Sequence, residues 1–342
     1  MKGSEFEPDS GIKAIALLSG GLDSTLAAAV VKRTGVDVIG LHIRTLFDTG
    51  RDRARAVEEA AKMLAVPLRT LDLSEGHLEI VRHPKHGRGA GMNPCLDCRV
   101  FMLAAAKRVM GEEGAQFVVT GEVLGQRPMS QHRAALDLVA KESGLDDRLF
   151  RPLSAAFLPD TLPVKEGWIR REDLPEIHGR GRQRQILLAE RFGIRDYPQP
   201  AGGCLLVEKA YATRLRDAFS HTGRDAMRAE DFLLLRCGRH FRLSDTIKVI
   251  VGRNERENGT LENYVSGRVA IRPVDTVGPL TLVEGDPLRE ELETAAALAA
   301  RYCDRENGGS LNMRVEQGAK ESVLSVVPLA EDDPRLSEWR IG

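Results

Sequence analysis

Residues 14–24 read AIALLSGGLDS, and this stretch decides the fold. Ala14–Leu18 is short and wholly apolar, as a strand buried inside a parallel sheet should be. Two glycines follow, and Ser24–Arg33 is typical of a helix that stops at Gly35. A buried strand that turns through glycines directly into a helix predicts a βαβ unit. Ligands of such sheets bind at the carboxyl ends of the strands.

The same alternation of strands and helices continues through the first half of the chain. It predicts an α/β fold, a Rossmann-like doubly wound parallel sheet over residues 12–207, followed by a smaller α+β domain over residues 225–330. Residues 74–94 and 159–203 show no clear periodicity, so we expect irregular segments there. The expected strands of the first domain are Ala14–Leu18, Val36–Ile43, Pro67–Leu73, Phe117–Thr120 and Leu149–Leu153, and its expected helices are Ser24–Arg33, Asp52–Leu64, Cys98–Glu113 and Ser130–Ser143. The second domain is expected to contain the strands Thr246–Val251, Val269–Arg272, Leu280–Val283, Leu311–Val315 and Ser322–Val327 and the helix Leu288–Tyr302.

The glycine loop has the chemistry of a phosphate site. Gly20 and Gly21 let the backbone approach an anion closely, because neither carries a Cβ atom. The following helix presents free N–H groups and its positive dipole end at that point, and Ser19 and Ser24 add hydroxyl donors. Asp23 would repel a phosphate unless a Mg²⁺ ion lies between them, so we assign it to metal binding and catalysis. The chain has no GxxxxGK[ST] sequence, which excludes a Walker-type loop.

SGGLDS resembles the pyrophosphate-binding loop of the PP-loop ATP pyrophosphatase superfamily. The resemblance implies ATP at the strand ends, cleavage between its α- and β-phosphates, and adenylation of a substrate oxygen. Thr120–Glu122 (TGE), with the later Gln131, resembles the fourth-strand motif of the 4-thiouridine synthetases, in which the glycine and the last glutamine contact ATP. Here Arg127–Met129 makes that stretch one residue longer than the family pattern. The expected ATP-binding residues are Leu18, Ser19, Gly20, Gly21, Asp23, Ser24, His42, Gly121 and Gln131.

Three of the five cysteines form a second pattern. Cys95 and Cys98 form a C-x-x-C at a helix start, where the helix dipole favours thiolate, and Cys204 follows two glycines that leave room for a bulky ligand. Three thiolates could hold a [4Fe–4S] cluster with one iron not bound by protein. Alternatively, two of them could carry a persulfide and resolve as a disulfide, or the set could bind zinc with a fourth ligand. Cys237 and Cys303 lie in apolar-patterned segments and are expected to be ordinary buried thiols.

Residues 93–98, NPCLDC, together with the later GGC resemble the cluster-dependent tRNA thiolation enzymes of the same superfamily, and the 2-thiouridylases carry a similar NPC-x-x-C. The resemblance covers about residues 12–207. It implies sulfur transfer to a tRNA uridine, with Cys95, Cys98 and Cys204 as catalytic residues and cluster ligands, and with sulfide or a persulfide carrier as sulfur donor. Asp97 is our candidate general base. Two alternatives are thiolation or amidation of a small molecule, and an RNA-binding adaptor, against which the intact SGGLDS argues.

Positive side chains concentrate between residues 236 and 253, beginning with RCGRHFRL. Because Lys and Arg neutralise backbone phosphates, this concentration predicts RNA contact; a solvated strand face or a dimerising unit is the alternative. Residues 231–258, with the later Gly278–Leu280, resemble the RNA-binding domain of the NFACT proteins, which implies tRNA as partner. The expected RNA-binding residues are Arg180, Arg182, Arg236, Arg239, Arg242, Lys248 and Arg253.

Composition sets outer limits on these interpretations. The formal net charge is −1, so RNA would have to be held by local basic patches. Hydrophobic residues make up 42% of the chain, but no apolar run approaches the roughly 20 residues of a membrane span, so we expect no membrane partner. An odd number of cysteines and the absence of a secretory signal favour the reducing cytoplasm.

Overall fold

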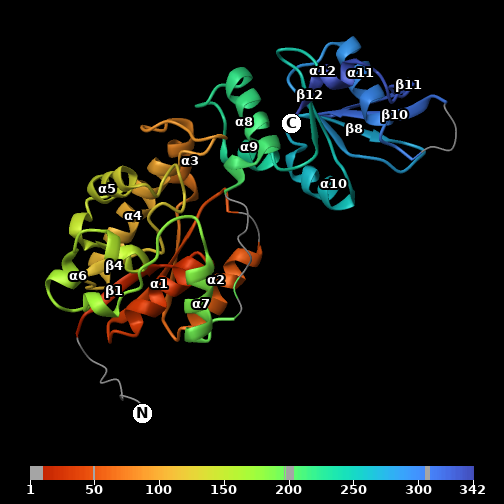
Figure 1. Cartoon of the computed structure of the whole chain (residues 1–342). Coiled ribbons are helices and arrows are strands. Elements are labelled where there is room, and N and C mark those ends of the chain that lie inside the picture. The colour runs from red at the N-terminus through yellow and green to blue at the C-terminus, as the bar shows by residue number, and fades with distance from the viewer. Residues whose placement is uncertain (1–10, 49–50, 196, 198–203, 305–308) are drawn as a thin grey trace. The chain divides into compact units, whose positions relative to one another are not determined.

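The computed structural model describes residues 11–48, 51–195, 197, 204–304 and 309–342 of the 342-residue chain (Figure 1). The chain divides into two compact units between Leu206 and Val207. Unit 1 precedes this boundary and unit 2 follows it. Each unit contains its own sheet and its own apolar core.

Unit 1 is built on a five-stranded parallel sheet with the order β3-β2-β1-β4-β5. This is the order of a doubly wound sheet, in which the chain reverses direction across the sheet between β1 and β4. The expected Rossmann-like fold is therefore confirmed. The strands are β1 (Lys13–Leu17), β2 (Asp37–Arg44), β3 (Leu68–Asp72), β4 (Phe117–Val119) and β5 (Leu149–Phe150).

Helices cover both faces of this sheet. Alternate residues of β1 enter different cores: Ala14 and Ala16 pack with helices α1 and α7, whereas Ile15 packs with α4 and α5. Because successive strand residues point to opposite faces, the two helix pairs lie on opposite sides of the sheet. The helices of unit 1 are α1 (Leu22–Lys32), α2 (Arg51–Met63), α3 (Ser74–Arg82), α4 (Cys95–Glu112), α5 (Arg133–Glu142), α6 (Leu162–Lys165) and α7 (Gln183–Phe192).

Two segments expected to be irregular contain helices. α3 lies in residues 74–94, and α6 and α7 lie in residues 159–203. α3 and α7 are short, and each buries a polar side chain, His77 and Gln185 respectively, which interrupts the apolar pattern that predicts a helix. The fifth strand is shorter than expected, because Pro152 cannot donate to a strand ladder and begins a 3₁₀ turn.

Unit 2 is a seven-stranded antiparallel sheet with the order β11-β10-β8-β9-β7-β6-β12. Helix α11 packs on one face of this sheet through a run of buried alanines. Strand β12, paired with β6, lies beyond residue 330, where we expected the domain to end. The elements are α8 (Lys209–His221), α9 (Ala229–Leu234), β6 (Arg239–Arg242), β7 (Lys248–Val251), α10 (Glu255–Leu261), β8 (Val269–Pro273), β9 (Thr281–Glu284), α11 (Arg289–Ala300), β10 (Leu311–Gln317), β11 (Lys320–Val326), α12 (Arg335–Trp339) and β12 (Arg340–Ile341).

Candidate functional site

The SGGLDS loop, Ser19–Ser24, connects β1 to α1 at the point where the sheet order reverses. Gly20 has φ +74°, and a Cβ atom there would lie 2.9 Å from Cβ of Ala56, so only glycine fits. Gly21 is the N-cap of α1 and offers no side-chain acceptor. The first N–H groups of α1 therefore lack a side-chain cap, as an anion-binding helix end requires.

Hydroxyl groups brace this loop from within. Ser24 Oγ accepts a hydrogen bond from the Ser19 N–H at 3.2 Å, donates to the Gly21 carbonyl at 2.9 Å and lies 3.1 Å from Ser19 Oγ. At the base of the loop, the buried His42 ring places Nδ1 3.2 Å from the Leu18 carbonyl oxygen. The predicted ATP-binding residues that precede and begin the loop thus lie together at the carboxyl end of β1.

The segment after β4, which we call loop 120–131, touches the SGGLDS loop. A Cβ atom on Gly121 would lie 2.5 Å from backbone atoms of Asp23 and Ser24, so the two loops are in backbone contact. Gln126 Nε2 donates to Asp23 Oδ2 at 3.0 Å, whereas Asp23 Oδ1 is buried without a hydrogen-bond partner among the described residues. Oε1 of the buried Gln131 also lacks one in that part of the chain. Unpaired buried oxygens are typical of a site that a ligand or ion completes.

Glu122, in the same loop, is a buried charge; it belongs to the TGE motif, but we predicted no role for it. It is 1% exposed and accepts from Arg151 Nε at 2.9 Å and Thr120 Oγ1 at 3.2 Å, with Arg99 Nε 3.3 Å from its other oxygen. Burial opposes ionisation, but the two arginines outweigh it and hold the pKa of Glu122 below its ordinary value. A carboxylate directly after a buried strand was the available signal, because such a charge must be paired.

The C-x-x-C cysteines lie in the first turn of α4. Asn93 Nδ2 lies 3.0 Å from Cys95 Sγ, and His77 Nε2 lies 2.7 Å from Cys98 Sγ. His77 comes from α3, the helix that we did not expect, and burial lowers the pKa of this histidine to about 4. A neutral imidazole therefore contacts the Cys98 sulfur at physiological pH.

Cys204 lies near this pair, although more than a hundred residues separate it from them in the chain. The Met92 N–H donates to the Leu206 carbonyl at 2.8 Å, which holds the Cys204 segment beside the cysteine turn. Burial raises the pKa of Cys98 above its usual range, and the charges of Cys204 and Cys95 raise it further. Burial likewise raises the pKa of Cys204 to about 11, against a lowering hydrogen bond from Leu206. The three thiols are thus close enough to influence one another.

A resident metal is not shown by this arrangement. Within the described ranges, no three His, Cys, Asp or Glu side chains are placed to hold a metal ion, so the cluster stays a prediction. Cys237 and Cys303 belong to unit 2. Cys303 is buried as expected, whereas Cys237 is half-buried.

Asp97 is placed to anchor a loop. Its Oδ2 accepts the His86 backbone N–H at 3.0 Å, and its Oδ1 lies 2.7 Å from His86 Nδ1. His86 Nε2 in turn lies 3.3 Å from Glu142 Oε1. Because both oxygens of Asp97 are engaged, the geometry supports a positioning role for this carboxylate, and the general-base role stays a prediction.

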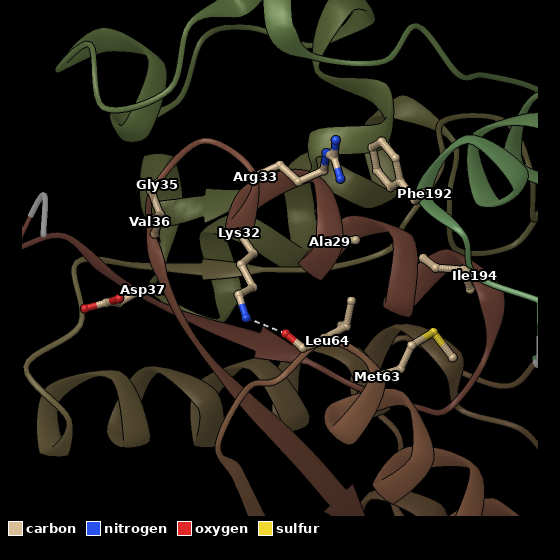
Figure 2. Close-up of a pocket in the computed structure, with 10 residues that line it drawn as sticks. All are labelled: Ala29, Lys32, Arg33, Gly35, Val36, Asp37, Met63, Leu64, Phe192 and Ile194. Atoms are coloured by element: carbon tan, nitrogen blue, oxygen red, sulfur yellow. Dashed lines mark hydrogen bonds between the residues drawn. The ribbon is translucent and has the colours of Figure 1, made fainter. Parts of the chain in front are cut away.

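A pocket of about 390 Å³ lies away from these loops, at the other end of α1 (Figure 2). It is lined by Arg33, just after α1, and by Phe192, at the end of α7, whose ring lies 4.6 Å below the Arg33 guanidinium. Asp37, the first residue of β2, also lines it, so the pocket lies at the amino ends of the strands. The length of α1 therefore separates this pocket from the predicted phosphate site.

The predicted RNA-binding arginines of unit 1 lie beside loop 120–131. The Gly179 N–H donates to the Leu124 carbonyl at 2.7 Å, which places the following residues next to that loop. Arg180 is exposed, whereas Arg182 is half-buried and its Nε has no hydrogen-bond partner among the described residues.

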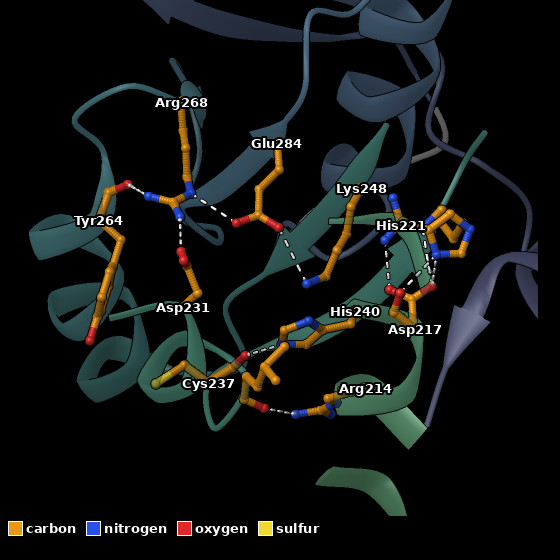
Figure 3. Close-up of polar contacts among 12 residues, drawn as sticks. Arg214, Asp217, His221, Asp231, Cys237, His240, Lys248, Tyr264, Arg268 and Glu284 are labelled. Carbon is orange, nitrogen blue, oxygen red and sulfur yellow. Dashed lines mark hydrogen bonds and ion pairs between the residues drawn. The ribbon is translucent and has the colours of Figure 1, made fainter. Parts of the chain in front are cut away.

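Three of the predicted RNA-binding residues of unit 2 pair with acidic side chains, and Figure 3 shows one of them, Lys248, beside Glu284. Arg242 pairs with both oxygens of Asp217, at 3.1 and 2.6 Å. Lys248 is 5% exposed and its Nζ lies 3.2 Å from Glu284 Oε2. The Lys248 ammonium group is therefore inside the unit, not on a surface open to RNA.

Arg253 and Arg239 differ in how they are held. Arg253 donates to Glu257 at 2.9 and 3.0 Å, which neutralises much of its charge. Arg239 lies over the Tyr302 ring, 4.5 Å from its centroid, and no acidic side chain contacts it among the interactions described. Of the positive side chains between residues 236 and 253, Arg242, Lys248 and Arg253 therefore each have an acidic neighbour.

Two families match parts of this chain. Residues 10–156 match the family described as thiamine biosynthesis protein (ThiI), and residues 238–340 match the NFACT protein RNA binding domain. The tRNA-specific 2-thiouridylase MnmA of Bartonella quintana (strain Toulouse) is 28% identical over 239 residues, which cover 61% of this chain and 53% of that protein. A probable tRNA sulfurtransferase of Methanothermobacter thermautotrophicus is 35% identical over 122 residues, 33% of this chain and 30% of that protein. The chain spans about half or less of the length of these relatives.

Solved structures are more distant. A 4-thiouridine synthetase–RNA complex with bound ATP has a TM-score of 0.36 at 20% identity and covers 56% of each chain. The C-terminal part of a fibronectin/fibrinogen-binding protein from Streptococcus suis has a TM-score of 0.27 at 15% identity, covering 84% of this chain and 99% of that one. None of the helices described is long and apolar enough to cross a membrane. The sequence matches thus relate residues 10–156 to the ThiI family model and residues 238–340 to the model of the NFACT protein RNA binding domain.

Proposed function

We propose that this chain is an ATP-dependent tRNA sulfurtransferase. The support is the ThiI-family domain, the similarity to proteins named as tRNA thiolation enzymes, and the NFACT RNA binding domain. The substrate is then a tRNA uridine, the cosubstrate is ATP, and the reaction belongs to the cytoplasm, where tRNA is modified. Sulfide or a persulfide carrier supplies the sulfur.

The first step of the proposed reaction is adenylation. A uridine carbonyl oxygen forms a bond to the α-phosphorus of ATP, the bond from that phosphorus to the bridging oxygen breaks, and pyrophosphate leaves. The uncapped N–H groups of α1 would hold the phosphates, and the Ser19 and Ser24 hydroxyls, which hydrogen-bond within the loop, would keep that loop in shape. The buried, unpaired oxygen of Asp23 fits a Mg²⁺ ion, which would screen the carboxylate from the phosphates.

The second step exchanges oxygen for sulfur. Sulfur forms a bond to the activated carbon, the carbon–oxygen bond breaks, and AMP leaves with the former carbonyl oxygen. If the sulfur comes from a cysteine persulfide, a second cysteine attacks the resulting mixed disulfide. The thiolated base is released, and the protein disulfide then needs a dithiol reductant. Any two of Cys95, Cys98 and Cys204 could supply this pair.

The alternative to the persulfide is a [4Fe–4S] cluster on the same three thiols, which cluster assembly would have to bring into a ligating arrangement. The half-buried Cys204 lies on a segment hydrogen-bonded beside the half-buried Cys95 and Cys98, and the sequence of unit 1 contains no fourth cysteine. A cluster held by Cys95, Cys98 and Cys204 would supply one iron without a protein ligand, at which sulfide can bind. Binding would require thiolates, so deprotonation of Cys98 and Cys204, whose pKa values burial raises, must accompany assembly.

One observation carries the proposal most directly. Arg99 Nε lies 3.3 Å from Glu122 Oε1, and these residues follow the cysteine turn and Gly121, a predicted ATP contact, respectively. The ion pair therefore joins the predicted sulfur site to the predicted adenylation site. A sulfurtransferase needs this proximity, because the adenylated carbon must be reached by sulfur before water hydrolyses it.

The test is thiolation of tRNA by the full-length protein, measured as retardation of RNA in a mercury-containing gel. Cys98→Ala should abolish thiolation and leave ATP-to-pyrophosphate exchange intact, whereas the control Cys237→Ala in unit 2 should keep both. Iron and acid-labile sulfide in anaerobically purified protein would favour the cluster; full activity without iron would favour the persulfide. Pyrophosphate exchange without any RNA thiolation would refute the tRNA substrate.

A further inference from the structure

Residues 176–194 lie outside both matched families, yet they border the predicted nucleotide site. The Gly179 N–H donates to the Leu124 carbonyl at 2.7 Å, and a Cβ atom on Gly125 would lie 3.5 Å from Gly179 Cα. These contacts place the segment against loop 120–131, which itself touches the SGGLDS loop.

The two helices that follow these loops run in the same direction. At their carboxyl ends, Arg33 lies over Phe192 at 4.6 Å, and both line the pocket of Figure 2. At their amino ends, the segment before α7 contacts loop 120–131, and Gln126 of that loop reaches Asp23 in the first turn of α1. Both helix N-termini therefore lie at the carboxyl edge of the sheet, each with the partial positive charge of a helix start. Arg182, the N-cap of α7, leaves that end without a side-chain cap.

Buried polar atoms without a hydrogen-bond partner occur in the first turns of both helices and in the adjoining loop 120–131. Gln185, in the first turn of α7, is 0% exposed, and neither its Oε1 nor its Nε2 has a partner among the described residues. Arg182 Nε is buried and unpaired in the same way, and the neighbouring loops contribute Asp23 Oδ1 and Gln131 Oε1. A buried polar atom that nothing pairs with is destabilising, so the presence of several on adjoining segments points to a bound ligand.

We infer that Arg182, Gln185 and the N-terminus of α7 form a second side of the ATP site and bind the polyphosphate. This inference rests on the proposed function, since it takes ATP as the nucleotide. A guanidinium fork matches phosphate oxygens, uncapped N–H groups accept an anion, and the Gln185 amide can donate to one. Burial separates this role from RNA binding: Arg180, two residues earlier, is exposed and suits an RNA backbone, whereas the buried Arg182 Nε suits a small ligand.

The first test is binding of Mg·ATP, pyrophosphate and AMP to the full-length protein by titration calorimetry. Arg182→Gln should weaken ATP and pyrophosphate about ten- to hundredfold and leave AMP nearly unchanged, because a charged hydrogen bond to the lost phosphates is removed. Arg184→Gln is the matched control: this exposed arginine of the same helix donates to the Glu176 carbonyl, and its loss should leave ATP affinity unchanged. Arg182→Lys keeps the charge but loses the fork, so ATP affinity should fall to an intermediate value.

Gln185→Met distinguishes ligand binding from a structural role. Replacing an unpaired buried amide by an apolar side chain of similar size should raise the unfolding midpoint and weaken ATP binding together. A lowered midpoint with unchanged ATP affinity would overturn the inference. Wild-type ATP affinity in Arg182→Gln would also overturn it, and loss of tRNA affinity alone in that variant would make Arg182 an RNA contact. If the wild-type protein binds ATP but thiolates no tRNA, the proposed function fails while this inference stands.

Discussion

Replacing Gly121 by alanine should disable the site through one methyl group. The added Cβ atom would lie 2.5 Å from the backbone C and O of Asp23 and from N of Ser24. Carbon atoms pack at about 3.5 Å or more, so one loop must move by about 1 Å. All three opposing atoms are backbone, so no rotamer change can relieve the clash. The SGGLDS loop must shift relative to loop 120–131.

The size of the effect follows from that displacement. Overpacking of this kind costs about 1–3 kcal/mol, which lowers the unfolding midpoint of a unit of this size by about 2–4 °C per kcal/mol. A 1 Å misplacement of reacting groups costs about 100-fold in rate. We therefore expect Gly121→Ala to remain folded, to unfold several degrees earlier, and to exchange pyrophosphate into ATP about 100-fold more slowly.

Gly111→Ala is the matched control. Gly111 lies in α4, and a Cβ atom there would meet nothing within 4 Å. The same substitution should stabilise that helix by about 0.5–1 kcal/mol and leave exchange unchanged. Thermal unfolding and pyrophosphate exchange are measured on both variants. Wild-type exchange and stability in Gly121→Ala would refute the contact between the two loops.

Four further predictions concern single charged or titratable side chains. Glu122→Gln leaves two arginines without their counter-charge and should cost about 3–5 kcal/mol at pH 7 by chemical denaturation. Because the pKa of Glu122 is held below its ordinary 4.5, its contribution to the free energy of unfolding is present at neutral pH and is lost as the pH falls below 4.5. If Glu122→Gln loses as much stability as the wild type between neutral pH and acid pH, this assignment is wrong. His240 is buried, which holds its pKa well below 6.5, so the stability of unit 2 should decline as the pH falls through 6.5, and His240→Gln should remove that decline. Arg242→Gln should destabilise unit 2 by about 1–3 kcal/mol by unpairing Asp217, with no change in the salt dependence of RNA binding. Arg239→Gln should instead lower the slope of log affinity against log salt by about one; equal slopes would remove Arg239 from the RNA surface.

The amino-acid sequence by itself determined the fold of unit 1 and the position of its phosphate loop. Both depend on residues that are neighbours in the chain. A short apolar strand, two glycines and a helix start occupy eleven consecutive residues, 14–24. The physical requirements of a βαβ turn act within that span, so no distant residue is needed to identify it. The C-x-x-C turn is equally local, and Cys95 and Cys98 were placed at a helix start for the same reason.

Only the tertiary structure decided which distant groups meet. Arg99 and Arg151 converge on Glu122, and the Met92–Leu206 hydrogen bond brings Cys204 to the other thiols. These partners are tens of residues apart, and no periodicity records which side chains face one another across a core. Charge is the clearest case. From the sequence we predicted that Lys248 binds RNA. Glu284 neutralises the Lys248 charge inside unit 2, and only the pairing of β7 with β9 brings the two residues together.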